Sequence, residues 1–377
     1  MTARLQRLRE RTNGYTVTPE QHVLFAYFGL GALTLIVLTG AAVRLTGSGL
    51  GCPTWPKCYG NLYPPLKTHA LIEFSNRVVT VPVVLAAGFA WLAGLRRRPY
   101  RRDLMWLGAM LPLGVIAQAV LGGLTVKGKL DYGWVMGHFA LSMLILVAAV
   151  TLAWRSRVAA RPAGASSSAE AMGAAGAMSF AGAASAAGAI SSAEAASPPG
   201  GLTTDRTIVK GLWGLVGLGA LTIFAGTAAT AAGPHAGGEP GQKINRLDFD
   251  GRGTMDFVIH RHAEIAFVFS VAAVGLWWLA RRRPSTPTVR SSLTFLCVVL
   301  ALQGVVGLDQ YETHLPTELV WVHVCLACAA WLSVLWAALA AGSPRRAPGG
   351  ASGLVEPVSE RPIGAREPFA SVNSPGN

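Results

Sequence analysis

The sequence predicts an all-α integral membrane protein with eight transmembrane helices, arranged as two four-helix bundles related by a pseudo-twofold axis. Of its 377 residues, 51% are hydrophobic and only 14% are charged. The apolar residues fall into eight stretches, each about as long as the roughly 20 residues that cross a bilayer. Polar positions inside the first four stretches recur inside the last four, which indicates a duplicated bundle.

The eight predicted spans follow one another along the chain. The first comes after a basic N-terminal segment; it is longer than the core of a cleaved signal and has no small-residue cleavage site, so we expect it to be retained. The second and sixth are the least apolar, because each contains charged residues. The spans are 22–44, 70–94, 104–126, 132–154, 207–232, 257–280, 289–309 and 317–341.

The spans divide the chain into five segments. The stretch between the bundles is mostly Ala, Gly and Ser, and the last stretch is rich in Pro, Gly and Ser, as in flexible linkers and disordered tails. Because each bundle has an even number of spans, both enter the membrane from the same side, and the repeat is parallel. The segments are a cytoplasmic N-terminal segment (1–21), a first bundle (22–155), a linker (156–205), a second bundle (206–342) and a tail (343–377).

The formal net charge of +13 indicates an orientation in the membrane rather than nucleic-acid binding. Lys and Arg gather in alternate loops, and the loops between them contain few. This positive-inside distribution predicts a multi-pass protein of the cell membrane with both termini in the cytoplasm. We therefore expect the lipid bilayer, and no nucleic acid, as the partner of these surfaces.

Histidines take part in the repeat, in which the numbers of matched positions differ by 184 or 185. Histidine inside a span is costly and usually functional, and two histidines on facing helices at one depth are what a haem iron needs. The repeat therefore predicts a haem-binding membrane protein. The matched positions are Gln118 and Gln303, His138 and His323, Asn76 and His260, and Arg77 and Arg261.

The second half contains the clearer pair of candidate iron ligands, His260 and His323. Both are expected near the outer end of spans that run in the same direction, so we predict ligation of a haem b by two imidazoles. His262 is expected to point to a different face and to make a polar contact between helices. Arg261 and its counterpart Arg77 either pair with a haem propionate or reach the lipid headgroups.

The first half departs from this pattern, because Asn76 stands where the second half has His260. Glu73 and His69 share a helix face with Asn76, and we expect this face to lie opposite the remaining metal ligand, His138. A stripe of His, Glu and Asn resembles a reaction site, with Glu73 and Asn76 as catalytic candidates. His69 is either a cofactor-binding residue or a solvated loop residue.

Two cysteines, Cys52 and Cys58, fall in the first outer loop, GCPTWPKC. This loop lies on the oxidising side of the membrane in the predicted topology, where disulfides form and persist. A disulfide closing the loop and a pair of free thiols are both open at this point.

In these residues the chain resembles the haem A synthase family. The resemblance rests on the order of the motifs and covers nearly all of both halves. The motifs are TGSGLGCPTWPKC, IEFSNR, the stretch from Gln118 to His138, IHRHAE, and the stretch from LQGVVGLDQYETHLP to WVHV. It implies an oxidoreductase that converts haem O to haem A by oxidising a ring methyl to a formyl group. The product would supply the assembly of a terminal oxidase, with haem O synthase and an electron donor as partners; self-association into a homo-oligomer stays open.

The resemblance also implies roles for the two halves. His260 and His323 resemble the ligands of a haem b that relays electrons, and His138 with Glu73 resembles the place where haem O is held and oxidised. Cys52 and Cys58 match the first-loop pair of the family.

One departure concerns the first-half ligands, since many members have histidine at the position of Asn76. The first-half iron is then held by His138 alone or together with His69, or else the first site is degenerate and inactive.

Two other functions compete with this interpretation. A dihaem electron-transfer cytochrome without a haem substrate would use the same histidines, but Glu73 and Asn76 make the two halves unequal. A transporter with parallel repeats would place its polar residues near the middle of the bilayer, whereas here they lie near the outer ends of the predicted spans.

Overall fold

The computed structural model describes residues 14–161, 203–239, 241–249 and 253–342, and within these residues the regular elements are eight helices. Each predicted span lies inside one of them, and all eight are long and apolar enough to cross a membrane. The helices are α2 (Pro19–Leu45), α3 (Thr68–Arg96), α4 (Arg102–Lys127), α5 (Tyr132–Ala160), α7 (Arg206–Ala232), α8 (Thr254–Arg282), α9 (Pro287–Glu312) and α10 (Thr317–Ala341).

One predicted segment boundary differs from the end of a helix, at the start of the linker. Helix α5 continues to Ala160, so the first part of the predicted linker, 156–160, is helical. Residues 162–202 of the linker, residues 343–377 of the tail and residues 1–13 lie outside the described residues.

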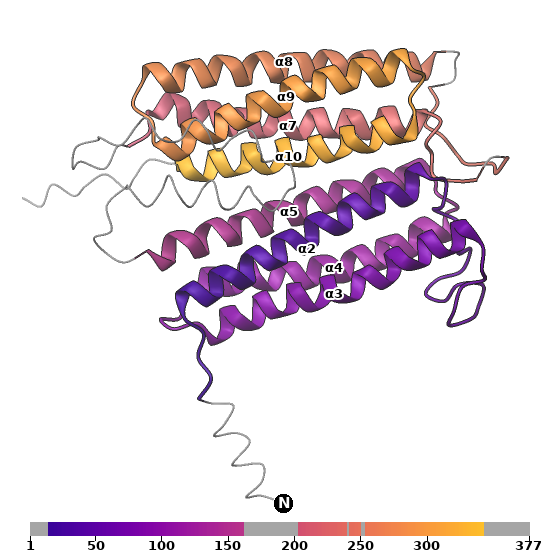
Figure 1. The fold of residues 1–377 in the computed structure, drawn as a ribbon, viewed down its shortest axis with the longest axis horizontal. Helices are drawn as coiled ribbons and strands as arrows, with labels where there is room; N and C mark the ends of the chain where they lie inside the picture. Colours follow the sequence, from indigo (N-terminus) through magenta and orange to yellow (C-terminus); the bar gives the residue numbers. More distant parts are fainter. Residues whose placement is uncertain (1–13, 162–202, 240, 250–252, 343–377) are drawn as a thin grey trace, which may run out of the picture. The chain divides into compact units, whose positions relative to one another are not determined.

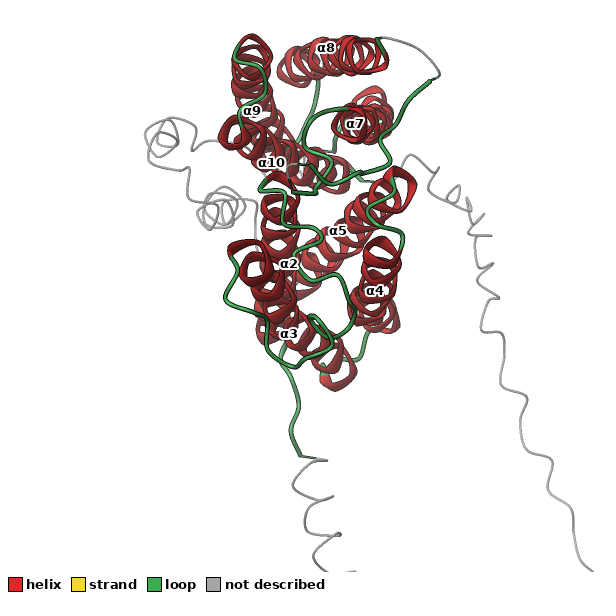
Figure 2. Cartoon of the chain, turned by 90° about the vertical axis from the view of Figure 1, so that its right-hand side faces the viewer, coloured by secondary structure: helices red, strands yellow, loops and turns green. Residues whose placement is uncertain are grey.

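The helices form two groups of four (Figures 1 and 2). In the first group α2, α3, α4 and α5 form a ring in which α5 packs back against α2. In the second group α7, α8, α9 and α10 form a ring in the same order, and α10 packs back against α7. Consequently α3 faces α5 across the first ring, and α8 faces α10 across the second.

Small side chains let the helices of the first group approach closely. Ala87 and Ala90 of α3 are fully buried. A Cβ on Gly108 of α4 would come within 3.1 Å of Cα of Trp91, and one on Gly29 of α2 would lie 3.5 Å from Cβ of Ala90. Small residues at these contacts are typical of membrane helices, because apolar side chains gain little by leaving lipid and packing contacts must hold the helices together.

The two groups contact each other through α2, α5, α7 and α10. The indole Nε1 of Trp331 donates to the backbone oxygen of Met143 at 3.4 Å, and Nε1 of Trp321 donates to that of Leu38 at 3.2 Å. The outer loops also meet, since the amide of Gly49 donates to the oxygen of Gly237 at 2.8 Å.

The offset between the halves differs from helix to helix. Helices α4 and α9 begin and end at residue numbers that differ by 185, the larger of the two offsets predicted from the polar residues. The first residues of α5 and α10 differ by the same number. Helix α8, however, begins and ends one position later relative to α3, and α7 begins and ends two positions later relative to α2. The predicted offset of 184 or 185 is therefore wrong for α3 and α8, whose offset is larger, because the loop from α3 to α4 (97–101) has one residue more than the loop from α8 to α9 (283–286).

Burial supports this register of α3 and α8. When the helices are aligned by their first residues, Thr68 and Thr254, Val83 falls on Phe269 and Ala87 falls on Ala273. Both residues of each of these two pairs are buried. A shift of two residues would rotate the helix by about 200° and place exposed positions in the core. The relation between α3 and α8 therefore decides which polar side chains occupy equivalent places.

Candidate functional site

The centre of the second group contains a pair of histidines that face each other from α8 and α10. The rings of His262 and His323 are 6.1 Å apart between centroids and inclined at 68°. Nδ1 of His262 lies 3.1 Å from the backbone oxygen of Thr222 on α7. A carbonyl oxygen only accepts, so Nδ1 carries the proton and Nε2 of the neutral ring keeps its lone pair.

The packing around this pair is tight. A Cβ on Gly226 of α7 would lie 3.0 Å from Cε1 of His262, and a Cβ on Gly307 of α9 would lie 3.4 Å from Cε1 of His323. Nδ1 of His323 is buried and has no hydrogen-bond partner among the described residues. Glycine at both positions leaves room for the imidazole rings.

His260 lies elsewhere on α8. Its side chain is exposed, its Nδ1 donates to the backbone oxygen of Asp256 at 2.7 Å, and its ring is 6.4 Å from that of Tyr311 on α9. His262 therefore points to a different face from His260, as expected, and its predicted polar contact with a neighbouring helix is confirmed by the bond to Thr222. The face it points to is, however, the one turned to His323. The structure does not bring His260 and His323 together.

The sequence contains a signal for this arrangement. The match of Asn76-Arg77 with His260-Arg261 does not use it. His262 stands seven residues before Phe269 and eleven before Ala273, the spacing of one helix face, and both of these residues are buried. Asn76 stands at the same intervals before Val83 and Ala87. The register thus pairs Asn76 with His262.

The first group contains the matching polar pair, Asn76 on α3 and His138 on α5. Oδ1 of Asn76 and Nδ1 of His138 are both buried without a hydrogen-bond partner among the described residues. A Cβ on Gly122 of α4 would lie 3.4 Å from Cε1 of His138, the same distance as in the second group. His138 and His323 therefore occupy equivalent environments.

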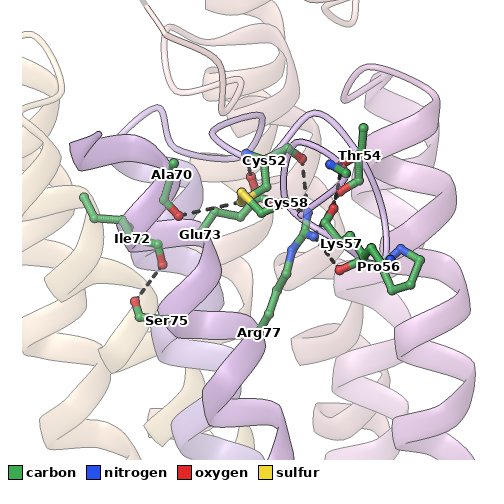
Figure 3. Close-up of a disulfide and its surroundings, with 11 residues drawn as sticks. Cys52, Thr54, Pro56, Lys57, Cys58, Ala70, Ile72, Glu73, Ser75 and Arg77 are labelled. Atoms are coloured by element: carbon green, nitrogen blue, oxygen red, sulfur yellow. Dashed lines mark hydrogen bonds and ion pairs between the residues drawn. A yellow bond between two sulfur atoms is a disulfide. The ribbon is translucent and has the colours of Figure 1, made fainter. Parts of the chain in front are cut away.

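Glu73 is buried at the outer end of α3, with only 6% of its surface exposed. Its Oε2 accepts a hydrogen bond from the amide of Cys52 at 2.7 Å, and its Oε1 pairs with the guanidinium of Arg77 at 2.5 Å (Figure 3). Both carboxylate oxygens are therefore engaged, one by the first outer loop and the other by a residue one turn further along the helix.

Arg77 extends this connection to the loop (Figure 3). Its guanidinium donates to the backbone oxygens of Thr54, Pro56 and Cys52 at 3.0 to 3.1 Å. Arg261 behaves differently, because it is exposed and pairs with Glu264 at 2.6 Å. The two arginines are not structural counterparts, and contact of either with a haem propionate stays a prediction.

The first outer loop is closed and lies on the first group. A disulfide joins Cys52 and Cys58, which confirms the first of the two alternatives. A Cβ on Gly123 of α4 would lie within 3.1 Å of the indole of Trp55, and one on Gly51 would lie 2.2 Å from the backbone oxygen of His69. The loop thus spans from α3 to α4, and Trp55 lies beside the residue that follows Gly122, the glycine next to His138.

His69 is held in the first turn of α3. Its Nδ1 lies 2.9 Å from Oγ of Ser48, a fully buried residue, and Oγ of Ser48 lies 2.9 Å from Oγ1 of Thr46. His69 is therefore neither free in solvent nor beside His138 in any recorded contact, and its role as a ligand stays a prediction.

The donor atoms fit the axial ligation of a porphyrin iron. Among the described residues there is no cluster of three or more His, Cys, Asp or Glu side chains suited to a bare metal ion. A haem iron takes only one or two ligands from the protein. His262 with His323 offers two imidazoles, whereas His138 with Asn76 offers one imidazole and an amide oxygen.

The chain has relatives among known proteins. Residues 24–335 match the family described as cytochrome oxidase assembly protein. A protein named heme A synthase from Bacillus pumilus is 32% identical over 123 residues, and one from Shouchella clausii is 37% identical over 132 residues. These matches cover 32% and 33% of this chain and 40% and 41% of the relatives, so the chain spans about two-fifths of their length. A heme A synthase from Shewanella oneidensis is 26% identical over 310 residues, which cover 77% of this chain and 87% of that protein.

Proposed function

Because the chain belongs to the family of cytochrome oxidase assembly proteins, we propose that it converts haem O to haem A for the assembly of a terminal oxidase. The reaction oxidises a methyl group on the porphyrin ring to a formyl group. The proposal rests on one observation: the two groups of helices repeat the same fold, but their central polar side chains differ. The second site has two facing imidazoles, whereas the first has one imidazole, an amide and a carboxylate tied to a loop.

The second group is proposed to hold a resident haem b between His262 and His323. The haem supplies one-electron relay when it is bound. The bond from Nδ1 of His262 to Thr222 fixes the tautomer that leaves Nε2 free for iron, and the glycines beside both rings leave room for them. His260 was the partner predicted from the sequence, and its exposed position favours His262 in its place.

The first group is proposed to hold haem O on His138. Asparagine is a poor iron ligand, so Asn76 would not hold the iron from the side opposite His138. The unpaired Oδ1 of Asn76 is available to accept a hydrogen bond there.

Glu73 is proposed to accept protons in the first site. The oxidation removes C–H hydrogens from the methyl group, with molecular oxygen as the oxidant and the electron donor supplying the electrons that reduce the second oxygen atom to water. A side chain that accepts and returns protons is therefore needed near the substrate. The loop from Cys52 to Cys58 excludes water above this carboxylate, and Arg77 orients it.

The cellular setting follows from the eight apolar helices and the charge distribution. The protein is a multi-pass membrane protein. We place it in the cell membrane with both termini in the cytoplasm, so both candidate sites lie near the opposite surface. Haem O synthase and an electron donor are the expected partners, and no nucleic acid is expected. Each candidate site is composed of residues from one chain, so a homo-oligomer is not needed to complete it.

The activity is tested by expressing the protein together with haem O synthase in cells that lack their own haem A. Extraction of the pigments followed by chromatography should reveal haem A. His138→Ala should abolish the product while the purified protein keeps the haem of the second group. A purified protein that contains haem but leaves haem O unchanged would support the alternative, an electron-transfer cytochrome without a haem substrate.

The ligand assignment is tested by absorption and electron paramagnetic resonance spectra of the second-group haem. His262→Ala should remove the signal of an iron with two imidazole ligands, and His260→Ala should leave it in place. The reverse result would return His260 to the ligand set and would leave the proposed activity untouched.

A further inference from the structure

A glutamine stands beside the histidine at the centre of each group. Nε2 of Gln303 on α9 donates to the backbone oxygen of His323 at 3.1 Å. Nε2 of Gln118 on α4 donates to the backbone oxygen of His138 at 2.9 Å. Gln118 and Gln303 are the same number of residues from the starts of α4 and α9, and His138 and His323 are the same number from the starts of α5 and α10. The two glutamines therefore have the same place in the fold.

The same two positions contain matching unpaired atoms. Oε1 of Gln303 and Nδ1 of His323 are both buried without a hydrogen-bond partner among the described residues. Oε1 of Gln118 and Nδ1 of His138 repeat this situation. A buried polar atom without a partner is costly, and four such atoms in two equivalent pairs call for a shared explanation.

The orientation of the imidazole brings the unpaired atoms to one side. A Cβ on Gly307 would lie 3.4 Å from Cε1 and 3.7 Å from Nδ1 of His323, so this edge of the ring faces α9. Gln303 is four residues before Gly307 and therefore lies on the same face of α9, one turn away. The amide of Gln303 is already attached to His323 through its nitrogen, and its oxygen is a buried acceptor without a partner.

We propose that Gln303 is a positioning residue whose amide oxygen accepts the Nδ1 hydrogen of His323 when Nε2 of that histidine holds iron. This inference rests on the proposed function, because it assumes the haem of the second group. A metal-bound imidazole must carry its proton on the other nitrogen, and a hydrogen bond to that N–H fixes the ring and makes it a stronger donor to the metal. Gln118 has the same relation to His138.

The two glutamines differ in one respect. Gln118 donates a second hydrogen bond to Oγ of Ser142 at 2.6 Å, so both hydrogens of its amide are used. The position equivalent to Ser142 in α10 is Ala327, which has no hydroxyl group. The first-group amide is thus held more firmly, as suits a site that must present a substrate.

The test measures the reduction potential of the second-group haem in the full-length protein purified with its haem. A His138→Ala background restricts the signal to that haem. Gln303→Leu removes the acceptor, which weakens electron donation by His323 and should shift the potential upward. Gln303→Glu replaces the amide oxygen with a charged acceptor and should shift it downward. Ala327→Ser adds a hydroxyl group like that of Ser142 without altering the acceptor, and should leave the potential unchanged.

Opposite shifts in the Leu and Glu variants support the inference, together with about a 10- to 100-fold weaker retention of haem in the Leu variant. Equal potentials in the wild type and both variants overturn it, since the acceptor would then lie elsewhere, for example at the backbone oxygen of Leu319. If the Leu variant loses its haem entirely, the Glu variant alone decides by the direction of its shift. A wild-type protein without haem contradicts the proposed function instead.

Discussion

At the scale of single residues, the two groups differ most where Asn76 and His262 occupy equivalent places. An imidazole and an amide are similar in size, but only the imidazole is a good iron ligand. One substitution on a shared scaffold therefore separates the site with two proposed iron ligands from the site with one. The unpaired Oδ1 of Asn76 indicates that this residue is not simply a packing replacement for histidine.

Exchange of these two residues should exchange the properties of the sites. Asn76→His offers a second imidazole opposite His138, so the first-group iron should become six-coordinate and low-spin. Electron paramagnetic resonance measures this change. His262→Asn should do the reverse in the second group. An unchanged first-group signal in Asn76→His would contradict the structural equivalence of Asn76 and His262.

A second residue-scale prediction concerns Gly226. Gly226→Ala places a Cβ 3.0 Å from Cε1 of His262, which is tighter than ordinary contact, so the ring must move and haem retention should decrease. Gly217→Ala is the matched control on the same helix, because no atom lies within 4 Å of its added Cβ. The haem-to-protein ratio after purification distinguishes them. Equal ratios would argue against His262 as a ligand.

At the scale of elements, the first outer loop and α3 act as one unit through Glu73 and Arg77. The carboxylate holds one amide of the loop, and the guanidinium holds three of its carbonyl oxygens. A charged pair in the outer part of a span is costly, so its retention beside the candidate reaction site indicates function. The loop and the carboxylate cannot move independently.

Glu73→Gln separates the two roles of Glu73. Glutamine can still accept the hydrogen bond from Cys52 but cannot take up a proton. If Glu73 is the proton acceptor, conversion of haem O should fall by about 10²- to 10⁴-fold while the loop stays in place. Hydrogen exchange at the amide of Cys52 reports on the loop. Activity retained in this variant would reduce Glu73 to a tether.

Arg77→Met tests the tether itself. Three hydrogen bonds to loop carbonyl oxygens and the ion pair with Glu73 are lost, so hydrogen exchange across residues 52–58 should become faster even though the disulfide persists. Arg261→Met is the control, because Arg261 pairs only with the exposed Glu264 among its recorded ionic contacts. Unchanged exchange in Arg77→Met would mean that the disulfide, Trp55 and the bond from Cys52 to Glu73 fix the loop without Arg77.

At the scale of the whole molecule, the two groups of four helices depend on each other. Helices α10 and α7 pack against α5 and α2, and Trp331 lies buried at this contact with its Nε1 bound to Met143. Gly49 and Gly237 connect the outer loops of the two halves. The two candidate sites are thus parts of one compact unit, a precondition for electron relay between them.

Trp331→Phe should lower the free energy of unfolding by about 1 kcal/mol, because a buried hydrogen bond between the groups is lost. Trp278→Phe should change it little, since 54% of Trp278 is exposed and its removal affects no contact between the groups. Unfolding in detergent followed by circular dichroism measures both. Equal stabilities would mean that the contact at Trp331 contributes little to holding the groups together.

The amino-acid sequence by itself determined the eight helices, their order and the repeat, because long apolar runs and loop charges leave little choice in a bilayer. It also identified His138, His323, Glu73 and the two cysteines. Only the tertiary structure decided that His262, rather than His260, faces His323, and that Arg77 holds the loop. The physical reason is rotational: a shift of two residues turns a helical side chain by about 200°. Matching the halves by residue identity cannot resolve that shift, whereas the buried faces of α3 and α8 do.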